Sequence, residues 1–210
     1  MASERLAFLS QMVEVFTSTV SFGERLGNMV HLAARHLKWE LCLYFSLDKS
    51  KETLSLQVSS RGLLPPHQRL EFRCGQGVVG EAATARKPVV VQRRDPQVLA
   101  ANAALGKLLP DFHTLAAFPV ADDNFLYGVL VFLDKGERSF TGGERQVVQL
   151  TCLMLAGTLR QALLQEEAKK RIAELSVLFE VGKAITATVE LEALLERIVT
   201  TTAKVINARG

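Results

Sequence analysis

The amino-acid sequence predicts an α+β fold in which about six antiparallel strands form a sheet between helices. Two observations indicate this fold. Short segments with alternating apolar residues follow one another across turns without helical crossovers, which is typical of antiparallel hairpins. Before the first and after the last of these segments, apolar residues recur every three or four positions, which predicts helices that cover the sheet.

The first part of the chain predicts two amphipathic helices, over 6–20 and 22–37. Their apolar residues recur at helical spacing: Leu6, Leu9, Met12 or Val13 and Phe16 in the first, and Leu26, Met29, Val30, Ala33 and Leu37 in the second. These two helices are expected to pack on the sheet.

Six segments predict strands because apolar residues alternate along them: 41–47, 53–59, 68–72, 88–92, 113–121 and 125–133. A short helix is expected at 77–86 and a weak one in the connection 97–109. In the first strand, Leu41 and Phe45 point to one face and Tyr44 to the other. We expect the N- and C-terminal helices to cover the Leu41 face, and the short helix and the connection to close the Tyr44 face.

One long helical pattern runs from Gly143 to about Gly182. From Leu164 onward, apolar residues at four- and three-residue spacing form a row that we call the seam: Leu164, Ala168, Ile172, Leu175 and Phe179. Such a row suits a two-stranded coiled coil. We expect a homodimer through the N- and C-terminal helices, and the alternative is a linker that packs on its own domain.

Composition excludes several classes of protein. A net charge of +3 with both signs mixed is too weak for a dedicated nucleic-acid binder, so no nucleic acid is expected as a partner. The start of the chain does not have the pattern of a signal peptide, and no uninterrupted apolar run has the length of a membrane span. We therefore expect no membrane contact by this part of the chain. Three cysteines without C-x-x-C spacing indicate reduced thiols in a cytoplasmic protein.

Gly75, Gly77 and Gly80 form a G-x-G-x-x-G pattern, which in another context binds a dinucleotide. Here the preceding segment alternates apolar and charged residues, as a half-exposed antiparallel strand does. The following helix is also too short for a βαβ crossover, which takes at least about 10–12 residues. The pattern therefore predicts backbone freedom at Gly75 and Gly77 and close packing at Gly80.

The same glycine segment resembles the central motif of GAF domains, and later segments are similar to that family's final hairpin and closing helix. The matching stretches are "GQGVVGEAA" from Gly75, "KPVVV" from Lys87, "TLAAFPV" from Thr114, "LYGVLVFLD" from Leu126 and "RSFTGGERQVVQLTCLMLAG" from Arg138. The resemblance covers roughly 22–163. It implies a GAF/PAS-like sheet with a long C-terminal signalling helix.

The resemblance also implies a function. GAF domains are regulatory, non-catalytic modules that sense small molecules and dimerise, so the expected parent is a sensor histidine kinase, a regulatory phosphotransferase or an enhancer-binding activator. The Cys-His pair of bilin-binding members and the Asn-Lys…Phe…Asp-Glu set of cyclic-nucleotide-binding members are missing here. No cofactor can therefore be named.

The C-terminal part of the chain repeats its beginning. Shifted by 169 positions, Thr19-Val20 meets Thr188-Val189, and nearly every apolar position of the first two helices recurs. A repeat at fixed spacing indicates a repeated structural unit. The expected organisation is a GAF domain over 1–163, a linker helix over 164–182 and the leading helix of a second, truncated GAF repeat over 183–210.

The expected ligand site lies on the sheet face under the short helix. Tyr44, Cys74, Val79 and His113 are predicted to line an apolar pocket for a small, mostly apolar molecule. No catalytic or metal-binding residue is predicted. Two alternatives stay open: a dimerisation module whose pocket is filled by its own side chains, and an enzyme similar to the GAF-like proteins that reduce methionine sulfoxide with cysteines.

Overall fold

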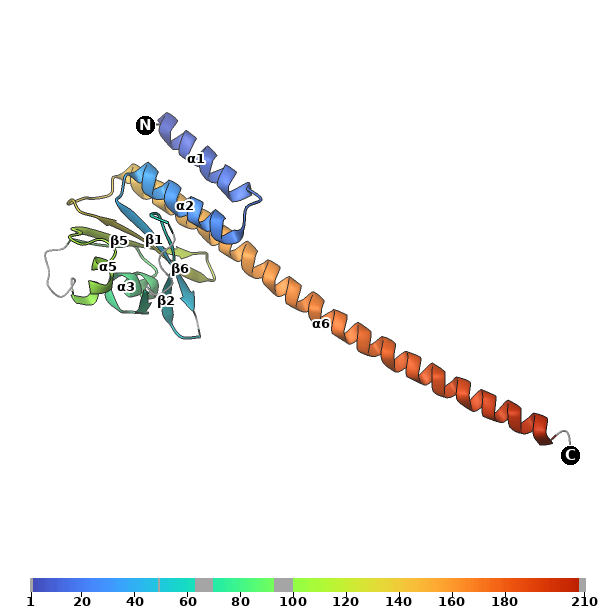
Figure 1. The fold of residues 1–210 in the computed structure, drawn as a ribbon. Helices are drawn as coiled ribbons and strands as arrows, with labels where there is room; N and C mark the ends of the chain where they lie inside the picture. Colours follow the sequence, from blue (N-terminus) through green and yellow to red (C-terminus); the bar gives the residue numbers. More distant parts are fainter. Residues whose placement is uncertain (1, 49, 63–69, 93–99, 208–210) are drawn as a thin grey trace. The chain divides into compact units, whose positions relative to one another are not determined.

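A computed structural model of the chain describes residues 2–48, 50–62, 70–92 and 100–207. Side-chain surroundings are described for all of these except 2–5, 184–193 and 205–207. The helices are α1 (Ala2–Thr17), α2 (Phe22–Leu37), α3 (Gly77–Ala85), α5 (Ala103–Gly106) and α6 (Gly142–Asn207). The strands are β1 (Leu41–Asp48), β2 (Thr53–Ser59), β3 (Glu71–Arg73), β4 (Val89–Gln92), β5 (Thr114–Ala121) and β6 (Leu126–Asp134) (Figure 1).

Within the described residues, the six strands form one sheet in the order β3-β2-β1-β6-β5-β4, and every neighbouring pair is antiparallel. The centre of the sheet is β1, β6 and β5, where Tyr44 lies opposite Leu130 and Leu130 opposite Phe118. The predicted α+β class and antiparallel sheet are confirmed.

Each face of the sheet has its own apolar core. The helix α2 and the first part of α6 cover one face, and α1 packs on α2. Met12, Met29 and Leu155 belong to the same core as Tyr44 and Phe132. We call this the helix-side core. The helix α3 and the segment around α5 cover the other face, here called the α3-side core (Figure 1). The described residues that form both cores all lie within the first 161 residues.

The sequence analysis assigned the two layers to the wrong faces. Cys42 and Tyr44 lie in the helix-side core, and Leu41, Leu43 and Phe45 lie in the α3-side core. Alternation separates the two sets of residues, but it does not say which layer each set meets. Between α2 and β1 the chain turns at Lys38, which adopts a left-handed conformation with φ 54°.

Local signals explain where the helices begin. Ser21 caps α2: its hydroxyl accepts from the Glu24 N–H at 3.3 Å, and the Glu24 carboxylate accepts from the Ser21 N–H at 3.0 Å. Thr141 and Glu144 form the same reciprocal pair at the start of α6. Such capping boxes satisfy backbone donors that have no partner within the helix.

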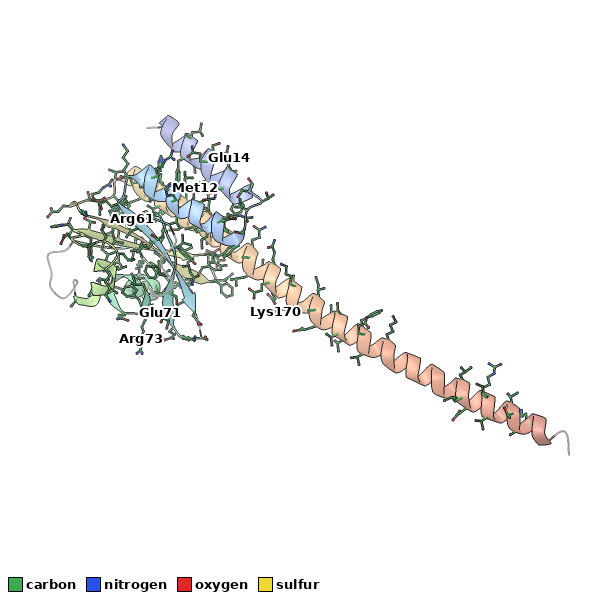
Figure 2. All side chains as sticks on the ribbon, in the orientation of Figure 1. Met12, Glu14, Arg61, Glu71, Arg73 and Lys170 are labelled. Atoms are coloured by element: carbon green, nitrogen blue, oxygen red, sulfur yellow. The ribbon has the colours of Figure 1, made fainter. Side chains whose placement is uncertain are left out.

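Several predicted boundaries differ from the observed ones. The third strand is Glu71–Arg73 instead of 68–72, and part of the predicted strand lies at 63–69, outside the described residues. The weak helix predicted over 97–109 overlaps the short α5, and its first residues fall within 93–99, also outside them. Figure 2 shows Glu71 and Arg73 at the sheet edge; both are exposed while Phe72 between them is buried, as the alternation predicted.

The chain divides into two compact units, Met1–Gln161 and Ala162–Gly210. The second unit belongs to α6, which continues to Asn207 and does not end near Gly182 as the sequence analysis expected. The repeat places the counterpart of the turn between α1 and α2 at Thr188-Val189, inside this helix. That turn depends on the Ser21–Glu24 capping box, and the counterparts of these residues are Glu190 and Ala193, which cannot form one.

Candidate functional site

The glycine turn before α3 is built as the sequence predicted. Gly75 and Gly77 have φ of 82° and 60°, a conformation that favours glycine. A Cβ on Gly80 would collide with the backbone oxygen of Arg73, so this glycine permits close packing of α3. The Gln76 side chain accepts from the Arg73 N–H at 3.0 Å and closes the turn. The turn connects an antiparallel edge strand to a nine-residue helix, which is not the setting of a dinucleotide site.

Asn102 is a buried polar residue that the sequence analysis did not single out. It is 1% exposed, and its side-chain oxygen accepts from the Val78 N–H in the first turn of α3 at 3.1 Å. A Cβ on Gly77 would lie 2.8 Å from the same oxygen. Asn102 therefore fixes the segment around α5 to the start of α3. The sequence signal for this role was a single asparagine within an alanine-rich segment.

The α3-side core is filled by large side chains. Leu105, Leu109 and Phe112 from the segment around α5 are at most 3% exposed, and they pack with Phe45 and Phe72 from the sheet. Phe45 and Phe72 meet edge to face with ring centroids 5.6 Å apart. The alanines of this connection were expected to leave space for a ligand. Among the described residues, its leucines and phenylalanine contribute large side chains to the core on this face.

The four predicted ligand residues do not surround one pocket. Val79 is fully buried in the α3-side core, and Cys74 packs at its edge. Tyr44 lies on the opposite face, where its hydroxyl donates to the Tyr127 backbone oxygen at 3.1 Å. His113 is exposed beside the start of β5, and its backbone N–H donates to the Asp134 oxygen. Tyr44 was placed with the others because of the inverted face assignment.

The three thiols are all free, and none is activated. Burial raises the pKa of Cys42 well above its usual value and that of Cys152 to about 12. The pKa of the half-buried Cys74 is raised by desolvation and by the Glu52 carboxylate. The thiolate is the reactive form of cysteine, so all three environments disfavour nucleophilic chemistry. Among the described residues, no group of three or more His, Cys, Asp or Glu side chains could hold a metal ion.

Arg138, just before α6, contacts residues of α2, β6 and α6. Its guanidinium donates to the carbonyl oxygens of Leu37 and Lys38 at 3.1 and 2.5 Å, where α2 ends. It also contacts the carboxylates of Asp134 at 3.3 Å and Glu144 at 3.5 Å. A cation at a helix C-terminus is favourable because the last carbonyls carry partial negative charge. Arg138 thus holds the start of α6 to the end of α2.

A second polar contact ties α6 to the sheet. Asp122, in the turn between β5 and β6, accepts from the Tyr127 hydroxyl at 2.7 Å and pairs with Arg160 at 3.8 Å. The Tyr127 hydroxyl and the turn N–H groups lower the pKa of Asp122. Desolvation and the Asp122 carboxylate raise the pKa of Tyr127 to about 12. The part of α6 within the first unit is thus anchored near both its ends.

The second unit presents its apolar residues to solvent. Ile172, Leu175 and Phe179 of the predicted seam are 64%, 64% and 72% exposed. Figure 2 draws the side chains of this part of α6, with Lys170 labelled. Lys170 pairs with Glu166, and Arg171 with Glu167, both at four-residue spacing. These ion pairs lie beside the seam and stabilise the helix only slightly.

One segment of the described residues, Gly142–Lys183, is long and apolar enough to cross a membrane by length and composition alone. Within the first unit this segment supplies Val148, Leu155 and Ala156 to the helix-side core. That packing accounts for part of its apolar character, since 39% of its most apolar window is buried.

This fold and these motifs agree with the comparison with known families. The family model described as GAF domain matches residues 19–159, so the chain belongs to the GAF domain family. The match spans α2, the sheet and the part of α6 that packs on it.

Solved structures of other GAF domains share the fold. The GAF domain of a phosphoenolpyruvate-protein phosphotransferase from Acinetobacter is 22% identical, with a TM-score of 0.64 over 77% of this chain and 96% of that one. The corresponding domain from Coxiella burnetii is 18% identical, with a TM-score of 0.65 over 79% and 98%. A free methionine-R-sulfoxide reductase from Neisseria meningitidis is 19% identical, with a TM-score of 0.61 over 77% and 92%. No curated protein sequence matches this chain significantly.

Proposed function

We propose that this chain is a regulatory, non-catalytic module of a cytoplasmic signalling protein and that it acts as a homodimer. The expected parents are a sensor histidine kinase, a regulatory phosphotransferase or an enhancer-binding activator. The observation that carries the proposal is the exposed seam at Ile172, Leu175 and Phe179. An exposed row of large apolar side chains marks an interaction site, and the spacing of this row suits a second copy of the same helix.

The first unit offers further apolar surface on the same helices. Leu6 and Val13 of α1 are 72% and 51% exposed, and Leu153 of α6 is 61% exposed. These residues support contact through the N-terminal helix as well as the seam. A dimer formed this way would pass a change in the domain along α6, provided that the helix has two arrangements which a signal stabilises differently.

Sedimentation tests the dimer. At micromolar concentration the chain should sediment at about twice its mass of 23.1 kDa, and Leu175→Asp should give monomers because it places a charge in the seam. Ala173→Asp is the matched control, since it adds the same charge to an exposed position outside the seam. A monomer at every concentration, or equal behaviour of the two variants, would contradict the proposal.

Small-molecule sensing is the second part of the proposal, and a dimerisation module without ligand is its alternative. The burial of Leu105, Leu109 and Phe112 in the α3-side core supports the alternative. A thermal-shift screen of metabolites distinguishes them, because a ligand raises the melting temperature according to its concentration relative to its Kd. For a sensor, some compound should stabilise the wild type, and Leu109→Ala at the α3-side core should change that shift. If no compound does so, the alternative is favoured.

The similarity to a methionine sulfoxide reductase suggests a third hypothesis, that the chain is an enzyme of this kind. The environments of its three thiols do not support this hypothesis. Raised pKa values at Cys42, Cys74 and Cys152 keep all three protonated at neutral pH. We expect no reduction of free methionine sulfoxide above the blank when a dithiol reductant is supplied. Turnover that disappears in Cys74→Ser would establish the enzyme reading instead.

We also propose that the second unit belongs to a tandem arrangement of GAF domains. Its support is the repeat: the apolar residues of α1 and α2 recur 169 positions later, within the second unit. Such a repeat would place α6 between two sensor-like domains.

A further inference from the structure

The seam of the second unit continues an exposed row of residues that begins in the first unit, on the same helix. Leu150 and Leu153 of α6 are exposed, and they precede the seam residue Leu164. Between them and the seam lie Gly157 and Gln161, which are also exposed. Together with the seam they form a set that we call the long row: Leu150, Leu153, Gly157, Gln161, Leu164, Ala168, Ile172, Leu175 and Phe179. Its length is about 45 Å, at about 1.5 Å of helix per residue.

The long row has a period of 11 residues. Its members follow one another at intervals of three, four and four positions throughout, so Leu153, Leu164 and Leu175 are each 11 residues apart. Eleven residues make about three full turns, so the row stays on one side of the helix. A seven-residue period counted from Leu164 would lead to the charged Arg171, whereas the observed spacing leads to Ile172. An 11-residue period favours a right-handed supercoil.

A row with this period needs a partner helix of the same period. Two helices stay in contact over this length only if their apolar rows wind around the helix axis at the same rate. A second copy of α6 meets this condition because it carries the identical row. In a parallel, symmetric pair each residue of the row meets its own counterpart. Leucines then face leucines, and the small residues Gly157 and Ala168 face each other's copies, which lets the two helices approach closely.

Gln161 is the one polar side chain in the long row. A glutamine side chain carries both donors and an acceptor, so two of them can hydrogen-bond to each other across a symmetric interface. Opposite an apolar residue, the same side chain would lose its bonds to water without replacement. A single polar residue in an apolar seam therefore fixes the register of two helices, at a cost in stability.

We infer that α6 pairs in parallel with the α6 of a second copy along the whole long row, and that Gln161 sets the register of this pair. The inference rests on the homodimer proposed above, and it adds the extent of the contact and a residue that makes it specific. The period creates the need for such a residue, because shifting one copy by 11 residues again places Leu164 opposite Leu175. In that shifted pair Gln161 would face Ile172, which offers it no hydrogen bond.

Disulfide trapping at neighbouring positions tests the extent and period of the row. With Cys74→Ser removing the half-buried thiol, Ile172→Cys in the second unit and Leu153→Cys in the first should both form covalent dimers under mild oxidation. Arg171→Cys is the matched control, since position 171 is exposed but lies outside the long row. It should stay monomeric on a non-reducing gel.

A mixing experiment tests the role of Gln161. A tagged chain with Leu164→Cys and an untagged chain with Leu175→Cys, both with Cys74→Ser, are mixed and oxidised, and the tag separates the matched products from the shifted pair that joins 164 to 175. The shifted product should be at least about tenfold less abundant than the matched ones, because it leaves a buried polar group unsatisfied. Gln161→Leu in both chains should remove this difference. Gln165→Leu, the same change outside the row, and the conservative Gln161→Asn should preserve it.

The possible failures have different signatures. An unchanged product ratio in Gln161→Leu would overturn the role of this residue in register, and equal trapping at 171 and 172 would overturn the long row. A chain that sediments as a dimer but gives no covalent product at 172 or 175 would overturn the parallel pairing. A chain that sediments as a monomer would overturn the homodimer itself, and the inference with it.

Discussion

At the scale of single residues, Gly77 shows how the turn before α3 depends on a missing side chain. Its φ of 60° is unfavourable for other residues, and a Cβ there would meet Asn102. Gly77→Val should therefore lower the free energy of unfolding by on the order of 1–3 kcal/mol, measured by urea denaturation. The loss should be the same with or without a nucleotide present, because the turn has a structural role.

Gly23 provides the matched control. It lies in α2, and a Cβ there would meet no atom within 4 Å. Gly23→Ala should leave stability unchanged or raise it by up to about 1 kcal/mol, since alanine favours a helix. If Gly77→Val were as harmless as Gly23→Ala yet removed tight binding of NAD or ATP, the glycine turn would be a nucleotide site after all.

The two tyrosines predict a pH dependence at the same scale. The pKa of each is raised, that of Tyr127 to about 12, chiefly by desolvation. Because an unfolded tyrosine ionises near pH 10, their contribution to stability is complete below about pH 10 and is lost as the pH rises through the folded values.

Absorbance near 295 nm can follow both groups, since the chain has only two tyrosines. In the folded chain the tyrosines should ionise at a higher pH than in guanidinium. Tyr127→Phe should remove the absorbance change that occurs near pH 12. A folded titration that overlays the unfolded one would show that the tyrosines are not buried and paired as described.

At the scale of elements, Arg138 should matter more than an ordinary surface arginine. It bonds two carbonyls at the end of α2 and the carboxylate of Glu144 in α6, and its guanidinium lies 5.0 Å from the Trp39 ring centroid. Arg138→Met should cost about 2 kcal/mol of unfolding free energy, the scale expected for the loss of hydrogen bonds made by a charged group. Emission of Trp39, which is the single tryptophan, reports the transition.

Arg61→Met is the control for that variant. Arg61 is half exposed and pairs with Glu40 at 3.5 Å, so its loss should cost no more than about 1 kcal/mol. Arg138→Lys should recover only part of the stability, because an ammonium cannot reach both carbonyls and a carboxylate as the planar guanidinium does. Equal losses of stability in Arg61→Met and Arg138→Met would contradict the claim that Arg138 holds α2 and α6 together.

Most elements were predictable because their signals are local. Alternation located the strands, and helical spacing located α1 and α2. The last hairpin turn, at 122–124, lies between the two final predicted strands. In that turn the Asp122 carboxylate accepts from the N–H groups of Asn124 and Phe125. The glycines before α3 were also correctly interpreted, since a positive φ and a close backbone approach are demands that glycine meets.

The assignment of sheet faces and the candidate site were less predictable because they depend on how elements far apart in the sequence pack in space. Periodicity placed Tyr44 opposite Leu43, but it does not say which helices cover each residue, and the packing of the two cores shows this. The role of Asn102 depends on its distance from α3, which sequence spacing does not reveal. The length of α6 was underestimated because a repeated apolar pattern was taken to include a repeated turn, although the capping residues were not repeated.

At the scale of the whole molecule, the chain consists of one GAF domain and one largely helical second unit. In the described residues the domain buries an apolar core on each face of its sheet, whereas the second unit exposes apolar residues in rows such as the seam. Burial of apolar surface is the main favourable term in protein association. The proposed roles of the chain therefore depend on what covers these rows, and the first of them is the seam.

Disulfide formation across the seam tests that central claim most directly. In a parallel two-stranded coiled coil, identical seam residues of the two copies face each other. With Cys74→Ser removing the half-buried thiol, Leu175→Cys should be trapped under mild oxidation as a covalent dimer in most of the chains. Ala173→Cys, which is exposed but outside the seam, should stay monomeric on a non-reducing gel. Equal cross-linking of the two variants, or cross-linking at 173 alone, would contradict the account.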